Sequence, residues 1–240
     1  MTVLSYLLPY LSDHMKGNIL FKTDISVEEA KKLQEELAKK VKVIPLEKPI
    51  ERVAGVDVCI KENRGIACIV VMSYPNMKIL DISIEIMEIS FPYIPGLLGF
   101  REGPVIIEAI KKLTLMPDVF IFDGQGIAHP RKMGIATHIG VVIDVPTIGC
   151  AKSVLCGTYK EPKEEKGSWS PLMYRGKVIG AALRTRKSVK PVIVSVGHKI
   201  ELSQCIDIVL KFCTRYRLPE PIRQAHIIAG KEMKRIESAL

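Results

Sequence analysis

The sequence lacks any stretch that could cross a membrane. No run approaches the roughly 20 apolar residues that a spanning helix needs. The first residues, MTVLSYLLPYLSDH, are apolar but short, have no basic leader and are interrupted by Pro9, so they do not have the layout of a signal peptide. We therefore expect a soluble, cytoplasmic protein with no membrane partner.

The sequence also lacks any cysteine pattern that binds metal. Its six cysteines form no C-x-x-C pair and show no spacing typical of metal ligands. Several lie inside apolar runs, where a free cysteine behaves as a small hydrophobic residue. This favours reduced cysteines in a reducing cytosol.

No internal repeat, low-complexity tract or long linker divides the 240 residues, so we expect one domain over 1–240 and a monomer, with 1–25 left unassigned. The composition, 48% hydrophobic and 25% charged, is that of an ordinary globular protein. A net charge of +9 favours a polyanionic partner, because each neutralised phosphate releases counterions. A basic enzyme unrelated to nucleic acid would carry the same charge equally well.

The hydrophobic periodicity predicts an α/β fold. Three strand-like runs joined by short gaps predict antiparallel hairpins, and strands alternating with helices then predict parallel strands. We therefore expect a mixed central sheet, three antiparallel strands then parallel strands, with helices on both faces. In chain order the predicted elements are a helix over 27–43 capped by Asp24 or Ser26, strands over 53–60, 65–74 and 78–89, a helix over 102–113 with Pro104 in its first turn, a strand in 117–126, a helix over 134–145, a strand in 146–153, a loop over 157–170, strands over 178–185 and 191–197, and helices over 201–213 and 218–236.

Three carboxylates occupy positions that suit a metal site. Asp57 lies in the middle of the apolar run VAGVDVCI, Asp123 follows the apolar strand VFIF, and Glu102 opens the helix between these strands. Taken singly, each fits a salt bridge or a helix cap better. If the two strands pair, however, the three acids converge, and oxygen ligands without a Cys/His cluster suit Mg²⁺ or Mn²⁺. A basic protein with such a site is predicted to cleave phosphodiesters.

A proline-rich stretch, FPYIPGLLGFREGP, places Tyr93 and Ile94 between Pro92 and Pro95. Proline fixes φ and removes a backbone donor, so this stretch predicts a rigid loop with the tyrosine at its tip. The alternative is a tight turn whose tyrosine packs back onto the core, and the stretch alone favours that alternative.

Several other side chains near these positions are ambiguous. His226 lies on the last predicted helix, and His129 follows a glycine-rich turn. Either histidine is more commonly structural, but His226 could equally orient a metal-bound water or protonate a leaving group, since the pKa of a histidine suits either role. Lys152 follows a strand end, where it could belong to a solvated surface or hold a phosphate.

The strings VAGVDV, FPYIPGLLGFREGP, FDGQGIAHPRKMGIATHIG, PTIGCAKS, VSVGHKI and PEPIRQAHI resemble the endonuclease V family of DNA repair. The resemblance runs from about residue 26 to the C-terminal helix. It implies a ribonuclease H-like fold, damaged DNA containing deoxyinosine as substrate, and Mg²⁺ as cofactor, with Mn²⁺ able to substitute. The cut would fall at the second phosphodiester bond 3′ to the lesion, leaving a 3′-hydroxyl and a 5′-phosphate.

The resemblance also implies roles for individual residues. Pro92, Tyr93, Ile94 and Pro95 would form a wedge that enters the duplex where the damaged base turns out. The remaining implied residues are the metal ligands Asp57, Glu102 and Asp123, the catalytic His226 and Lys152, and a base pocket around Gly96, Leu98, Gly124, His129, Gly134 and Ile135.

Two other functions stay open from the sequence. Some relatives act on inosine in RNA, and no residue here decides between the polymers, which differ by the 2′-hydroxyl. A lesion-binding protein without catalysis is disfavoured, because all three carboxylates are present.

Overall fold

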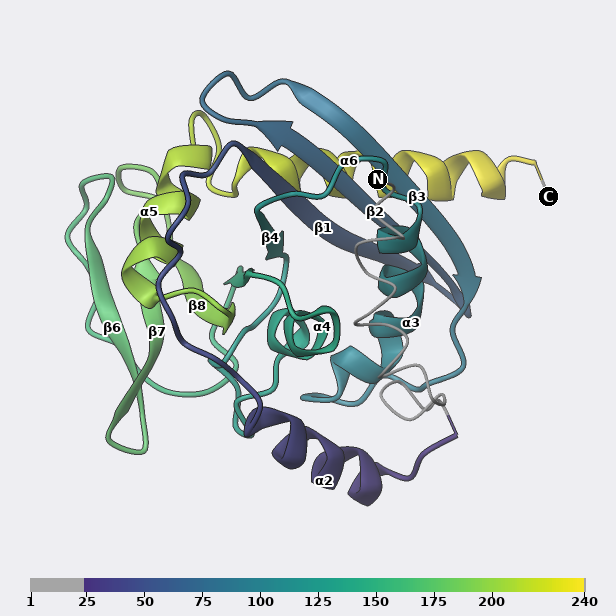
Figure 1. Cartoon of the computed structure of the whole chain (residues 1–240), viewed down its shortest axis with the longest axis horizontal. Coiled ribbons are helices and arrows are strands. Elements are labelled where there is room, and N and C mark those ends of the chain that lie inside the picture. Colours follow the sequence, from purple (N-terminus) through teal and green to yellow (C-terminus); the bar gives the residue numbers. More distant parts are fainter. Residues whose placement is uncertain (1–23, 240) are drawn as a thin grey trace.

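A computed structural model describes residues 24–239 and builds them around one eight-stranded sheet (Figure 1). Most of the unassigned segment 1–25 therefore lies outside the described residues. The strands are β1 (Arg52–Lys61), β2 (Arg64–Ser73), β3 (Ile79–Glu88), β4 (Val119–Phe122), β5 (Thr147–Ala151), β6 (Trp169–Tyr174), β7 (Lys177–Leu183) and β8 (Val192–His198). The helices are α2 (Val27–Ala38), α3 (Leu98–Lys111), α4 (Ile135–Ile143), α5 (Leu202–Phe212) and α6 (Glu220–Glu237).

The sheet is mixed, in the order β3-β2-β1-β4-β5-β8-β7-β6. The predicted hairpins β1–β2 and β2–β3 are antiparallel, and β4 and β5 continue parallel to β1, as expected. The other edge differs, because β8, β7 and β6 return to antiparallel pairing. β6 was not predicted: its six residues include Pro171, which is tolerated in a strand only at an edge or a bulge, and β6 is an edge strand.

Helices cover both faces of the sheet, as predicted. Helices α5 and α6 pack with one hydrophobic cluster, which includes Val53 and Cys68, and α3 and α4 pack with a second cluster on the opposite face, which includes Val56 and Ile69. Because β1, β2 and β4 are buried on both faces, their sequences read as continuous apolar runs rather than as alternating ones.

Helix α3 corrects one local prediction. The helix begins at Leu98, so Pro104 lies inside it rather than in its first turn, and Glu102 lies in its second turn rather than at its start. A proline at that position cannot donate to the carbonyl of Phe100, so one helical hydrogen bond is missing there. Proline is most common in the first turn of a helix, and for this reason the sequence predicted that the helix starts at residue 102 and not at Leu98.

The structure also bears on the cysteines and on membrane-spanning helices, within the residues that it describes. All six cysteines fall within residues 24–239 and all six are free, four of them buried. Over the same residues, no helix combines the length and the apolar character that crossing a bilayer demands.

Candidate active site

The three predicted carboxylates meet at the carboxyl end of the parallel strands. In the parallel pair β1–β4, Val56 lies beside Phe122, so Asp57 and Asp123 follow at the same level, and the Asp123 amide donates to the Val56 carbonyl (3.1 Å). Glu102 reaches the same place from α3, and all three line a small cavity of about 70 Å³. We call Asp57, Glu102 and Asp123 the carboxylate centre.

The negative charge of the carboxylate centre is not balanced by its surroundings. Burial, followed by the charge of Asp123, raises the pKa of Asp57 to about 6 against the lowering effect of His226. Burial, followed by the charges of Asp57 and Asp123, raises the pKa of Glu102 to about 8. Carboxyl groups crowded in a dry site hold their protons until a cation compensates their charge.

Two basic side chains contact this centre from outside. The Nδ1 atom of His226, on α6, lies 2.9 Å from the Asp57 Oδ2 atom, and the ammonium group of Lys152 forms an ion pair with Asp123. Among residues 24–239, no three Asp, Glu, His or Cys side chains are already arranged to hold a metal ion. The donor set is nevertheless one of oxygens that suits a hard divalent cation, and such an ion would compete with Lys152 for Asp123.

Gly55 explains how His226 comes so close to Asp57. Gly55 and Asp57 lie on the same face of β1. A Cβ atom at Gly55 would lie only 2.1 Å from the backbone of Pro221. The absence of a side chain lets the first turn of α6 rest directly on β1. His226 is then one turn further along α6, beside Asp57, with 63% of its side chain exposed.

A second cavity of about 300 Å³ adjoins the carboxylate centre and shares Asp123 with it. Its lining includes all six residues assigned to a base pocket: Gly96, Leu98, Gly124, His129, Gly134 and Ile135. We call it the base cavity. Glycine is required at two of these positions, because a Cβ atom would lie 2.5 Å from the Ile135 side chain at Gly124 and 2.2 Å from the Gln125 carbonyl oxygen at Gly134.

Part of the lining of the base cavity was not predicted from the sequence. Tyr93, Ile94, Pro95 and Lys152 also line it, as do the previously unassigned Gly99, Gln125, Met133, Ala151, Ser153, Val154 and Leu155. Residues 153–155 follow the carboxyl end of β5, the same edge of the sheet that carries Asp123, so the strand-end rule could have found them.

The proline loop presents its aromatic ring to solvent. Tyr93 is 69% exposed, whereas the neighbouring Phe91 is buried against Phe100, with ring centroids 5.7 Å apart. The alternative in which the tyrosine packs back onto the core is therefore wrong. Phe91 fills that role, and Tyr93 is free to meet a partner. We call residues 92–95 the wedge loop.

His129 is buried and neutral. Its Nδ1 atom accepts from the backbone N–H of Arg131 (3.2 Å), so its proton is on Nε2, which lies 3.0 Å from the Gly96 carbonyl oxygen. Burial, followed by the charge of Arg131, lowers the pKa of His129 to about 4. A histidine held in this state shapes the cavity wall and does not carry charge near neutral pH.

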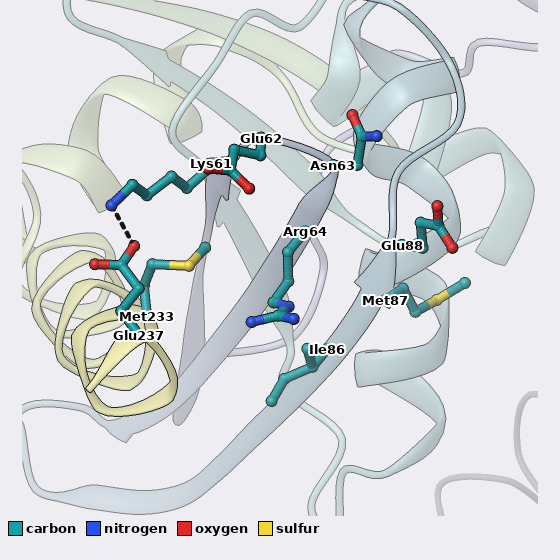
Figure 2. A pocket seen from close by; sticks show the side chains of 9 residues that line it. All are labelled: Lys61, Glu62, Asn63, Arg64, Ile86, Met87, Glu88, Met233 and Glu237. Atoms are coloured by element: carbon teal, nitrogen blue, oxygen red, sulfur yellow. Dashed lines mark ion pairs between the residues drawn. The ribbon is translucent and has the colours of Figure 1, made fainter. Parts of the chain in front are cut away.

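A larger cavity, of about 450 Å³, lies elsewhere, at the β1–β2 turn between β3 and the end of α6 (Figure 2). Its walls mix charges, with Lys61 paired to Glu237 at 2.7 Å and the side chains of Arg64 and Glu88 nearby. None of the predicted site residues lines it. Its size alone therefore does not identify it as an active site.

Known proteins of one family resemble this chain over most of its length. The family model described as Endonuclease V matches residues 35–227. The chain belongs to the endonuclease V family. It is 52% identical over 204 residues to Endonuclease V of Dictyoglomus turgidum, covering 85% of this chain and 90% of that protein.

Solved structures of the family share the fold. Endonuclease V from Bacillus subtilis superposes with a TM-score of 0.87 at 34% identity, covering 92% of this chain and 98% of that one. Ciona intestinalis Endonuclease V, in complex with a 24mer DNA containing an inosine followed by a ribo-adenosine, gives 0.76 at 31% identity, covering 88% of this chain and 98% of that one. The fold is therefore ribonuclease H-like, and the activity is that of a metal-dependent DNA repair endonuclease directed to deoxyinosine.

Proposed function

We propose that this chain hydrolyses the second phosphodiester bond 3′ to deoxyinosine in DNA, leaving a 3′-hydroxyl and a 5′-phosphate. Asp57, Glu102 and Asp123 would hold Mg²⁺, with Mn²⁺ able to substitute. The observation that carries the proposal is the adjacency of a carboxylate centre with unbalanced charge to a cavity of base size, which share Asp123. The proposal further assumes a chain that acts as a single domain and as a monomer.

The carboxylate centre supports the metal assignment through its charge. A bound Mg²⁺ would activate water and neutralise charge that develops on the phosphate. The raised pKa values of Asp57 and Glu102 show that their ionised forms are destabilised in this site, so a bound cation would stabilise both carboxylates.

His226 contacts Asp57 and Lys152 contacts Asp123, and both would serve the scissile phosphate. With Nδ1 directed at Asp57, the exposed Nε2 of His226 is left to hold a proton for the water or for the leaving oxygen. The Lys152 ammonium, 46% exposed beside Asp123, can contact a phosphate oxygen as well as the carboxylate.

The wedge loop supports recognition in a duplex. Turning a base out leaves a gap in the stack, and an aromatic ring placed in such a gap recovers about 1–3 kcal/mol of stacking. Tyr93 is exposed between two prolines that restrict the backbone, so little conformational entropy is lost when it enters.

The base cavity supports recognition of hypoxanthine by backbone groups. Deamination replaces the donor of adenine by a carbonyl acceptor and gives N1 a proton. Backbone donors and acceptors can read that change where glycines let them approach the base edge, as at Gly124 and Gly134.

A nicking assay tests the proposal. One end-labelled duplex with a single deoxyinosine is incubated with Mg²⁺, with Mn²⁺ and with a chelator, and the product is sized against markers. We expect a metal-dependent cut at the second 3′ bond. A cut at another bond would contradict the assigned position. Cleavage of inosine-containing RNA but not of this duplex would contradict the choice of polymer.

A further inference from the structure

The carbonyl oxygen of Gly96, where the wedge loop ends, accepts hydrogen bonds from three side chains. These are the Nε2 of Gln34 (2.9 Å), the Nε2 of His129 (3.0 Å) and the Nη2 of Arg131 (2.9 Å). A carbonyl oxygen has two lone pairs, so three donors are more than its usual complement. Gly96 has a φ of +80°, a conformation that few other residues adopt. The end of the loop is therefore fixed both by its backbone and by its neighbours.

Gln34 joins this carbonyl to a second segment. Its side chain is fully buried on α2, and its Nε2 also donates to the Met133 carbonyl (3.1 Å), while its Oε1 accepts from the Arg131 Nε (2.6 Å). Because an arginine Nε can only donate, the orientation of the amide is fixed. One side chain thus connects α2, the wedge loop and the segment over 131–133.

The other end of the wedge loop is also held. The Nη1 of Arg101, on α3, donates to the Phe91 carbonyl (2.6 Å). Phe91 packs in a small cluster with Ala30 of α2, Leu97 and Phe100. Tyr93 therefore lies on an exposed tip between two fixed ends, and α2 contributes to both.

Helix α2 packs at the periphery of the fold through two small hydrophobic clusters. It lies outside the sheet layers (Figure 1) and contacts α4, and its Ala30 shares a small hydrophobic cluster with Ile94 of the wedge loop. A buried glutamine that uses its donors and its acceptor on functional loops is not needed to pack a peripheral helix, since an apolar residue would pack at lower cost.

We infer that Gln34 is a positioning residue that holds Tyr93 ready to enter a duplex, an inference that rests on the wedge function proposed above. A loop that is already fixed loses less entropy on insertion, so the contribution of Gln34 is made when a base must be turned out of paired DNA. Lesions that are already unpaired need no such insertion.

The test compares two substrates with the same flanking duplexes, one with deoxyinosine paired and one with deoxyinosine inside a bubble of unpaired bases. Gln34→Leu should raise KM for the paired substrate about tenfold more than KM for the bubble substrate, the scale of a lost buried hydrogen-bond set, and leave kcat unchanged. A part of the loss that is common to both substrates would come from Gly96 and Met133, which also line the base cavity. Gln34→Glu keeps the acceptor for Arg131 but loses both donors, so it should change KM in the same direction. It also serves if the leucine variant does not fold.

Two further variants calibrate the result. Leu37→Ala removes a buried α2 side chain that packs beside Met133 and Val141, so it weakens the helix without touching Gly96 and should not discriminate between the substrates. Tyr93→Ala should reproduce the selective loss, and adding Gln34→Leu to it should not widen the difference between the two substrates.

The outcomes separate the two claims. If Gln34→Leu loses activity equally on both substrates, or on neither while its melting temperature is retained, the positioning role is wrong. If Tyr93→Ala itself shows no preference between the substrates, the wedge assignment in the proposed function is wrong instead.

Discussion

The carboxylate centre and the end of the wedge loop lie on two sides of the base cavity, and their polar groups are arranged in opposite ways. At the carboxylate centre, acids outnumber their partners, and the pKa values of Asp57 and Glu102 are raised. At Gly96, donors outnumber the acceptor, and every donor comes from a buried or half-buried side chain. The first region is built to take up a charge, whereas the second is built to keep its shape.

This contrast fits the roles proposed for the two regions, chemistry at the carboxylate centre and recognition at the wedge loop. A site for chemistry gains from unbalanced charge, because an incoming cation and phosphate restore the balance only when they bind. A recognition site binds better when its hydrogen bonds are already formed in the free protein, because fewer groups then lose conformational entropy on binding.

The largest effect should come from removing charge at the carboxylate centre. We expect Asp123→Asn, and equally Asp57→Asn, to slow single-turnover nicking at least about a thousandfold, since metal ions supply several kcal/mol of transition-state stabilisation. Binding to the deoxyinosine duplex, measured by gel shift, should persist.

A matched control is Asp118→Asn, which removes an aspartate directly before the same strand. Asp118 accepts from the backbone N–H groups of Glu51 and Arg52, far from the base cavity. This variant should nick at the normal rate. Normal nicking by Asp123→Asn would contradict the metal assignment.

A smaller effect should follow from removing the ammonium group of Lys152, which pairs with Asp123 of the carboxylate centre. Lys152→Met should lower kcat about a hundredfold, as the loss of one charged donor near a reacting phosphate does. It should also lower the Mg²⁺ concentration needed for half-maximal activity, because the ammonium no longer competes for Asp123.

Titration of Mg²⁺ in the nicking assay measures both quantities for Lys152→Met. Lys177→Met, at an exposed lysine on β7, controls for the loss of one positive charge. A higher Mg²⁺ requirement in Lys152→Met would show that the lysine helps to hold the metal site and does not compete with the ion.

The carboxylate centre was accessible from the sequence, and the region around Gly96 was not. Asp57 and Asp123 stand out because each interrupts or ends an apolar run, and the carboxyl ends of parallel strands meet at one edge. Gln34 stands out in no such way. It lies in a charged amphipathic helix, and its partners are carbonyl groups more than 60 residues away, which no local pattern reveals.

The same distinction explains one of the two errors in the fold. The three hairpin strands and the parallel strands follow from periodicity and apolar runs, which are local. β6 exists because β7 offers it an edge to pair with, and α3 starts before Pro104 because residues 94–97 already form a turn there, with the Leu97 amide donating to the Ile94 carbonyl. The pairing of β6 depends on a neighbour that the sequence does not place. The turn over 94–97 is local, but Pro104 gave the stronger signal for a helix start.

The smallest effects should appear in stability against pH in the presence of a chelator, and the two regions should differ in sign. Glu102 has a pKa of about 8 when folded against 4.5 ordinarily, so unfolding releases a proton between these values and stability falls as pH rises from 4.5 to 8. His129 has a pKa of about 4 when folded against 6.5 ordinarily, so unfolding takes up a proton and stability falls as pH falls from 6.5 to 4.

Urea denaturation of the wild type, Glu102→Gln and His129→Gln across this range measures both slopes. Relative to the wild type, Glu102→Gln should gain stability on the alkaline side and His129→Gln on the acid side, after subtraction of any loss that is independent of pH. The Asp57 carboxyl, with its pKa raised from 3.8 to about 6, overlaps the histidine window with the opposite sign. The difference between each variant and the wild type therefore carries the test, because Asp57 is common to both proteins. Difference curves that are flat with pH would mean that neither region titrates in the folded chain as its burial requires, and the contrast between them would then rest on geometry alone.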